Sequence, residues 1–150
     1  MASSILADPN GLNSGEAYVF SGCDGGVESY GSGCPGTGGL IPALDLLGCP
    51  AAGQTVTLTV TNGLGGVNAL LFLGAGKAQV SMGGGCDFLL ASFLPGGVPI
   101  VLSGSGAGDG ELSFTTLMPN LGPVAFNMQA LVQDPGSVTG HTNGIEVTVE

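Results

Sequence analysis

Short runs in which apolar and polar residues alternate, separated by glycine, proline and asparagine, recur along the chain. The clearest run is TVTLTVT at residues 55–61, which places Val56, Leu58 and Val60 on one face of a strand and four threonines on the other. Such alternation is typical of an antiparallel strand with one buried and one solvated face. Because the chain also holds 30 Gly and 9 Pro among 150 residues, a fold of long helices is excluded.

The spacing of these runs predicts the fold class. Turn residues recur about every eight to twelve positions, as in sandwiches. We therefore expect an all-β fold, an antiparallel β-sandwich or jelly roll of about 8–10 short strands with an N-terminal extension strand. The strands are expected at residues 16–20, 43–48, 55–61, 68–74, 77–82, 86–91, 99–104, 110–116, 123–133 and 144–150. Tight reversals are expected at Asn62-Gly63, Asp109-Gly110 and Asn143-Gly144, and a turn at Leu94-Pro95-Gly96.

Composition divides the chain into two parts. Residues 1–30 form an N-terminal extension with a single good strand, and residues 31–150 form the β-sandwich domain. The extension runs into a glycine-rich linker, DGGVESYGSGCPGTGG at residues 24–39. A single strand cannot build its own sheet. We expect it to pair either with the downstream sandwich or with another chain.

The charged residues exclude some partners. The chain has eleven acidic residues, Lys77 as its only Lys or Arg, and a formal net charge of −10. Nucleic acid is not expected as a partner, because neutralising phosphates requires many Lys and Arg side chains. No membrane span is expected either, since no apolar stretch approaches the ~20 residues that a spanning helix needs.

Four cysteines, Cys23, Cys34, Cys49 and Cys86, indicate an oxidising and therefore extracellular or cell-surface location. A zinc site is the alternative, but no C-x-x-C pair is present and the only histidine, His141, is far away in the sequence. Two disulfides are therefore favoured over metal binding. Three connectivities remain open at this point.

Two family resemblances add to these expectations. The segment DPNGLNSGEAYVFSG at residues 8–22 resembles the closing part of an FG-GAP repeat, the blade unit of integrin-like β-propellers. With one incomplete repeat, the chain cannot form a propeller. The rest of the chain resembles a C-terminal β-sandwich module of large secreted bacterial proteins, often found directly after FG-GAP repeats. This second resemblance rests on YGSGCPGTGG, LLGCP, ALLFLG, MGGGC, LSGSGAGDG, MQALVQDPG and TNGIEVTV, in this order over residues 30–149.

The second resemblance implies a disulfide pairing. In that family the cysteine of a Y-G-x-G-C-P-G motif and the cysteine of a later G-C motif recur together, while the G-C-P position is often another residue. Carried over to this sequence, the resemblance implies Cys34–Cys86 and leaves Cys23–Cys49. The latter pair would fasten the N-terminal segment to the sandwich. Between neighbouring subunits it would instead crosslink a polymer.

The FG-GAP resemblance also implies a calcium loop, with Asp8, Asn10, Ser14 and Glu16 at the matching positions. Calcium takes six to eight oxygen ligands, several of them carboxylates. This segment offers two carboxylates and places Leu12 where the repeat usually has Asp or Asn. A solvated turn is the favoured interpretation, and no cofactor is expected.

No arrangement of residues predicts an enzyme. His141 lies in a turn-like TGHTNG segment, where an exposed loop histidine is the ordinary interpretation. Asp109 and Glu111 are expected at a solvated hairpin tip rather than as a catalytic pair. The chain has no Trp and only Tyr18 and Tyr30 as tyrosines, so a sugar-binding cleft has little support. It also lacks an N-x-[ST] sequon, so any glycans would be O-linked.

The sparse charge and the single extension strand favour a structural role. Residues Ala17, Tyr18, Val19 and Phe20 all suit a strand, and adding them to a neighbouring sandwich would satisfy their backbone groups. Repeated between subunits, this contact would build an extracellular fibre or surface assembly. The strand folding back on its own sandwich is the alternative packing. The alternative function is a C-terminal interaction, adhesion or sorting module of a larger secreted protein.

Overall fold

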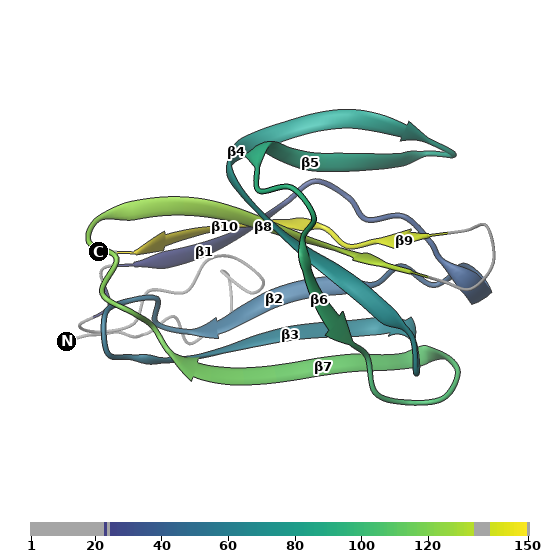
Figure 1. Cartoon of the computed structure of the whole chain (residues 1–150), viewed down its shortest axis with the longest axis horizontal. Coiled ribbons are helices and arrows are strands. Elements are labelled where there is room, and N and C mark those ends of the chain that lie inside the picture. The colour runs from purple at the N-terminus through teal and green to yellow at the C-terminus, as the bar shows by residue number, and fades with distance from the viewer. Residues whose placement is uncertain (1–22, 24, 134–138, 150) are drawn as a thin grey trace, which may run out of the picture.

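The computed structural model describes residues 23, 25–133 and 139–149, and these form two antiparallel sheets (Figure 1). The strands are β1 (Gly26–Tyr30), β2 (Ala43–Gly48), β3 (Thr55–Leu64), β4 (Asn68–Gly83), β5 (Cys86–Phe93), β6 (Val98–Val101), β7 (Ala107–Leu117), β8 (Val124–Val132), β9 (Gly140–His141) and β10 (Gly144–Val149), with one 3-10 turn at Thr37–Gly39. The larger sheet has the order β1-β10-β8-β4-β5, with β6 also paired to β4 and β9 to β8. The smaller sheet has the order β2-β3-β7. The expected all-β sandwich is confirmed.

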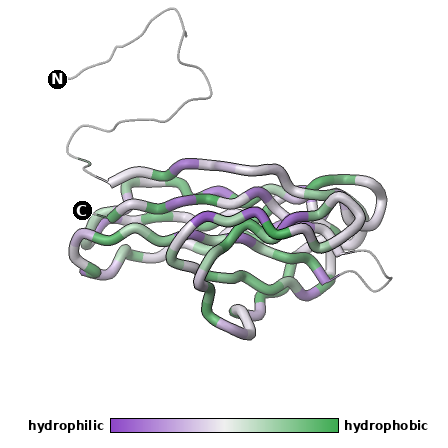
Figure 2. Tube along the Cα trace, turned by 90° about the horizontal axis from the view of Figure 1, so that it is seen from above, coloured by the Kyte–Doolittle hydropathy of each residue, from purple (hydrophilic) through white to green (hydrophobic). Residues whose placement is uncertain are grey.

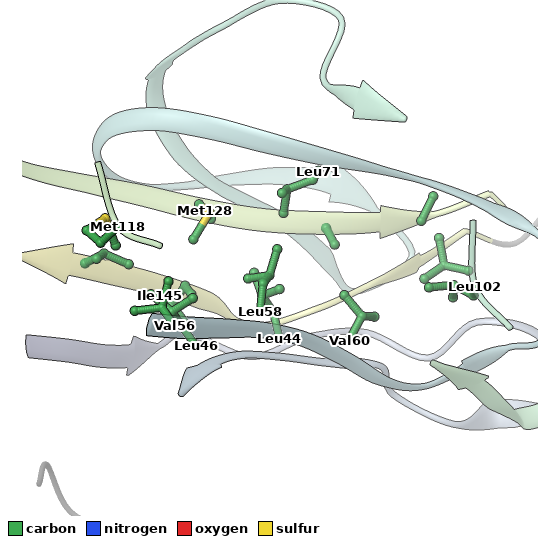
Figure 3. Close-up of a cluster of buried hydrophobic side chains, with 14 of the residues drawn as sticks. Leu44, Leu46, Val56, Leu58, Val60, Leu71, Leu102, Met118, Met128 and Ile145 are labelled. Carbon is green, nitrogen blue, oxygen red and sulfur yellow. The ribbon is translucent and has the colours of Figure 1, made fainter. Parts of the chain in front are cut away.

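The core lies between the two sheets (Figure 3). In β3, Val56, Leu58 and Val60 are buried, whereas the two threonines between them are half-buried and the two that flank them are exposed. The opposite wall comes largely from β10, β8 and β4 of the larger sheet. Hydrophilic and hydrophobic positions accordingly alternate along the strands (Figure 2). The core consists of Leu44, Leu46, Val56, Leu58, Val60, Ala69, Leu71, Leu102, Met118, Met128, Ala130, Val132, Ile145, Val147 and Val149.

Strand β1 corrects the linker prediction. Within the glycine-rich linker expected at residues 24–39, Gly26–Tyr30 forms a strand that pairs antiparallel with β10, with Gly26 opposite Thr148 and Tyr30 opposite Gly144. The apolar strand β10 offers a backbone edge that this short polar segment can pair with. Glycine is needed at the contact, because a Cβ on Gly144 would lie 2.6 Å from the Tyr30 ring. The larger sheet therefore begins within the segment assigned to the extension.

Strand β4 corrects the expectation of two separate strands at residues 68–74 and 77–82. It runs unbroken for 16 residues, pairing with β8 over Ala69–Gly74 and with β5 over Gly74–Gly83. The glycines were interpreted as strand breaks, but a Cβ on Gly74 would lie 2.8 Å from the Ala91 carbonyl oxygen. Gly74 therefore permits close strand approach. After it, β4 curls away from the sheet, and the β4–β5 hairpin lies over β8, β9 and β10 (Figure 1).

The three expected tight reversals are also wrong. Asn62 and Gly63 form a bulge within β3, Asp109 and Gly110 lie within β7, and Asn143 joins β9 to β10, which both run beside β8. The glycines at the first two places again serve close packing. A Cβ would lie 2.7 Å from the Leu102 side chain at Gly63, and 2.5 Å from the Leu64 carbonyl oxygen at Gly110. The turn at Leu94-Pro95-Gly96 is present between β5 and β6.

Two disulfides join distant parts of the chain. Cys23 is bonded to Cys49, which follows β2, and Cys34 is bonded to Cys86 at the start of β5. This is the pairing that the family resemblance implies. Both bonds lie within one chain, and Cys34–Cys86 fastens the β4–β5 hairpin to the segment before β2. The two disulfides are compatible with secretion.

Candidate functional site

The candidate site is the outer edge of β7, which ends the smaller sheet opposite β2. From Leu112 to Leu117 the edge reads LSFTTL, six residues without charge, proline or glycine. Segments of this length and composition have high β-propensity and readily pair with further strands. Natural proteins usually protect such edges with charges, prolines or covering elements.

The backbone direction along β7 follows from its hydrogen bonds. The Glu111 carbonyl accepts a bond from the Ser103 N–H at 2.9 Å, on the side facing away from β3. Peptide groups alternate in direction along an antiparallel strand. The N–H and C=O groups of Ser113, Thr115 and Leu117 therefore also point away from β3. Within residues 23, 25–133 and 139–149, no strand pairs with this stretch of the edge.

Two large apolar side chains lie on the same edge. Phe114 is 56% exposed and Leu117 is 62% exposed. Phe114 is paired with the buried Leu58 of β3 and so points to the core side of its sheet, but the larger sheet does not cover it there. The edge therefore offers hydrogen-bonding groups and uncovered apolar surface together.

The opposite edge of the smaller sheet is closed by side chains. The Asn143 side chain accepts a hydrogen bond from the Leu44 N–H at 2.9 Å and donates one to the Leu44 carbonyl at 3.0 Å. The Leu46 N–H donates to the Asp45 carboxylate at 2.8 Å. These side chains occupy backbone groups of β2 that an added strand would need for its own hydrogen bonds.

The edges of the larger sheet carry their own protection. The middle of β1 is the exposed Glu28, and β6 contains Pro99, which has no N–H to donate. The backbone of β5 forms hydrogen bonds with side chains of β1 and β8. The Tyr30 hydroxyl donates to the Leu89 carbonyl at 2.9 Å, and the Leu89 N–H donates to the Gln129 side chain at 2.9 Å. Of these edges, β7 is the unprotected one.

Gln129 is the central polar residue beneath the hairpin. Its side chain is fully buried, and besides accepting from the Leu89 N–H it donates to the carbonyls of Asp87 and Thr142 at 3.2 and 3.0 Å. Gln129 and the buried Asn127 both lie in β8, within the strand expected at residues 123–133. The signal for this role is a pair of amides at alternate positions of an otherwise apolar run.

Replacing Gln129 is expected to loosen the hairpin. The substitution Gln129→Leu removes the amide and leaves the buried Leu89 N–H without its partner, which lowers the free energy of unfolding by about 2 kcal/mol. Urea unfolding measures this change. Gln133→Leu, at an exposed position just after the same strand, is the matched control and should change stability by less than about 0.5 kcal/mol. Equal effects of the two substitutions would contradict the role given to Gln129.

Lys77, the chain's only lysine, connects the β4–β5 hairpin to β1 and β10. Lys77 Nζ lies 3.0 Å from a Glu28 carboxylate oxygen, 3.4 Å from one of Glu146, and 4.9 Å from the centre of the Tyr30 ring. Its hydrogen bond to Glu28 is the main reason why the Lys77 pKa is raised. The pKa of Tyr30 is also raised, chiefly by burial, against the lowering effect of the Asn127 hydrogen bond.

These shifts predict a loss of stability in alkali. In the folded protein, both groups have a pKa above the value that they have in the unfolded chain. Their contribution to the free energy of unfolding is therefore complete below about pH 10 and is lost as the pH rises through the folded pKa values. Urea unfolding at several pH values between 8 and 11 should show the fall. In Tyr30→Phe the fall should be shallower, because the phenol no longer ionises. An unchanged slope in that variant would contradict the assignment to Tyr30.

His141 corrects the expectation of an exposed loop histidine. It lies in β9 and is 4% exposed, and its backbone exchanges two hydrogen bonds with Cys34, which is 2% exposed. Its Nδ1 lies 3.2 Å from the Asp87 carbonyl oxygen of the hairpin. The histidine is buried because the hairpin covers the outer face of β8 and β9.

The remaining candidates are two acidic residues of β7 and residues outside the described part of the chain. Asp109 and Glu111 are exposed positions of β7, in a strand rather than at the expected hairpin tip. The calcium candidates Asp8, Asn10, Ser14 and Glu16 lie outside the described residues. So does the assembly strand, Ala17, Tyr18, Val19 and Phe20.

A shallow hollow lies at the end of the sandwich that carries β9. It encloses about 170 Å³ of space that is partly open solvent, and its lining contains no acidic, histidine or cysteine side chain. Its lining consists of Gly36, Thr37, Leu40, Pro42, Asn62, Gly63, Leu64, Val132 and Gly140.

Comparisons with protein-family models, with curated proteins and with solved structures give no match for this chain. In the part of the chain that the structure describes, no helix has the length and apolarity that crossing a membrane requires.

Proposed function

We propose that the protein is a structural subunit of an extracellular fibre or surface assembly, in which subunits join by strand addition. In the proposed contact, Ala17–Tyr18–Val19–Phe20 of one subunit pairs with the β7 edge of the next. The observation that carries the proposal is the unprotected β7 edge, in a fold whose β2, β1, β6 and β5 edges are closed, charged or interrupted by proline.

The chemistry of the two partners supports this pairing. An added strand would satisfy the outward backbone groups of Ser113, Thr115 and Leu117. In an extended donor, Tyr18 and Phe20 project to the same side, where they could cover Phe114. Neither the donor residues nor the edge from Leu112 to Leu117 carries a charge. The contact therefore buries no unpaired ion.

The donor and the acceptor are different surfaces, so each subunit gives one strand and receives one. Such a heterologous contact propagates into an open filament unless its rotation closes a ring. An extracellular location accords with the two disulfides, which resist reduction outside the cytosol. It also accords with the sparse charge of the chain, in which 8% of residues are charged.

A second candidate is a C-terminal interaction, adhesion or sorting module of a larger secreted protein. It is favoured by the resemblance of residues 30–149 to such modules. In that case the β7 edge would receive a strand from a different protein, and the isolated chain would stay monomeric.

Negative-stain electron microscopy of the non-reduced full chain at neutral pH tests the proposal. Regular fibres are expected, and a chain lacking residues 1–22 should give single small particles under the same conditions. Single small particles from the full chain would overturn the polymer proposal and favour the terminal module. Fibres formed equally well without residues 1–22 would overturn the choice of donor.

A further inference from the structure

The side chains of Cys34, Cys86 and His141 meet at one point of the fold. One ligand atom from each, the two sulfurs and a ring nitrogen, lies within 4.8 Å of the others. The structure shows the two sulfurs bonded as a disulfide. In the reduced chain, the same position would hold two thiols beside an imidazole.

The backbone fixes two of the three residues firmly. Cys34 and His141 face each other in an antiparallel bridge, with N–H···O distances of 2.8 and 3.2 Å. Gly33 permits this approach, because a Cβ there would lie 2.3 Å from the His141 carbonyl oxygen. The β4–β5 hairpin brings Cys86 to the pair, and hydrogen bonds of Leu89 with the Tyr30 and Gln129 side chains also connect that hairpin to the sheet beneath it.

The hydrogen bond of the His141 imidazole leaves its other ring nitrogen available as a metal ligand. Because the Asp87 carbonyl can only accept a hydrogen bond, the Nδ1 atom of His141 must carry the proton that it donates there. The lone pair is then on Nε2. Histidines that bind metals commonly donate their other N–H to a backbone carbonyl in this way, which fixes the ring and its tautomer.

We propose that the reduced Cys34–Cys86 pair and His141 form a binding site for Zn²⁺. Zn²⁺ readily binds sulfur and imidazole nitrogen, whereas Ca²⁺ and Mg²⁺ favour oxygen ligands. Each thiol loses its proton on binding, and a water molecule completes the tetrahedral set. The oxidised pair has no thiolate to offer, so zinc binding and the disulfide are alternative states of the same residues. The site would be available before the chain is oxidised.

The second cysteine pair provides a matched control. The chain has one histidine, and it lies beside Cys34 and Cys86, so Cys23 and Cys49 offer two sulfurs without an imidazole. Cys23→Ser/Cys49→Ser keeps the proposed site. Cys34→Ser/Cys86→Ser removes it and leaves the same number of thiols.

The test uses both double variants as full chains, reduced by a water-soluble phosphine. In that reaction the phosphine, the disulfide and one water give the phosphine oxide and two thiols. Co²⁺ is the probe, since tetrahedral thiolate coordination gives it intense visible bands and a sulfur-to-metal charge-transfer band. Cys23→Ser/Cys49→Ser should show these bands at one Co²⁺ per chain and lose them when Zn²⁺ is added. Cys34→Ser/Cys86→Ser should not show them.

Adding His141→Gln to Cys23→Ser/Cys49→Ser should weaken Co²⁺ binding by more than about tenfold. Replacing a residue that only hydrogen-bonds a metal ligand usually costs about tenfold or more in metal affinity, and His141 is proposed as a ligand itself. Circular dichroism of the same samples shows whether each variant keeps its sheets. If His141→Gln unfolds, the comparison of the two cysteine variants still decides. Tetrahedral bands of equal strength in both cysteine variants, or no tetrahedral bands in either, would overturn the proposal.

Discussion

Charging the open edge of β7 should abolish polymer formation and leave the subunit folded. The variant is Phe114→Lys/Leu117→Lys, which places two ammonium groups beside the backbone groups that a donor strand would pair with. Edge lysines prevent strand addition because the charge would have to be buried in the contact. Both side chains are more than half exposed, so each substitution should change the free energy of unfolding by less than about 0.5 kcal/mol.

A matched variant separates this edge effect from a general effect of charge. Val80→Lys/Met82→Lys changes the net charge equally, at two apolar side chains of the β4–β5 hairpin that are 53% and 57% exposed. It should polymerise like the unmodified chain. Light scattering after size-exclusion chromatography measures assembly in both variants. Loss of assembly in both, or in neither, would contradict the assignment of the acceptor edge.

Removing the Cys34–Cys86 disulfide is expected to have the largest effect on stability. The bond spans 52 residues, and the chain-entropy relation for a loop of this length gives about 4 kcal/mol of stabilisation. Cys34→Ala/Cys86→Ala should therefore lower the free energy of unfolding by about this amount in urea. It should also let the hairpin open locally, so that the Leu89 amide exchanges with solvent faster.

The other disulfide again serves as the comparison. Cys23–Cys49 spans 26 residues and does not involve the hairpin. Cys23→Ala/Cys49→Ala should lower overall stability without selectively accelerating exchange at Leu89. Faster exchange at Leu89 in this variant alone would contradict the claim that Cys34–Cys86 fastens the hairpin.

The sequence predicted those parts of the fold in which one face of a strand is buried. The alternation in β3 is strong because Val56, Leu58 and Val60 all face the core, and the structure confirms it. Strand β1 has no such signal, because VESY owes its conformation to pairing with β10. Gly74, Gly63 and Gly110 were interpreted as breaks or turns, although each permits close packing inside a strand. Glycine alone does not reveal which of the two roles it has.

The candidate site depends on neighbours that the sequence does not specify. Nothing in LSFTTL distinguishes an edge strand from a central one, and the open side of β7 follows only from the strand order. Likewise, His141 is far from the cysteines in sequence. It meets Cys34 and Cys86 because β9 and the β4–β5 hairpin come together on one face of the sheet. The buried amide of Gln129 has its role only because that hairpin covers it.

Amide hydrogen exchange of β7 in the assembled and the single subunit tests whether a strand is added at this edge. The full chain in its assembled form is compared with the chain lacking residues 1–22. We expect the Ser113, Thr115 and Leu117 amides, which point away from β3, to exchange more slowly in the assembly, while the Phe114 and Thr116 amides, already paired with β3, change little. Equal exchange of the outward amides in both samples, or new protection along β2 instead, would contradict strand addition at this edge.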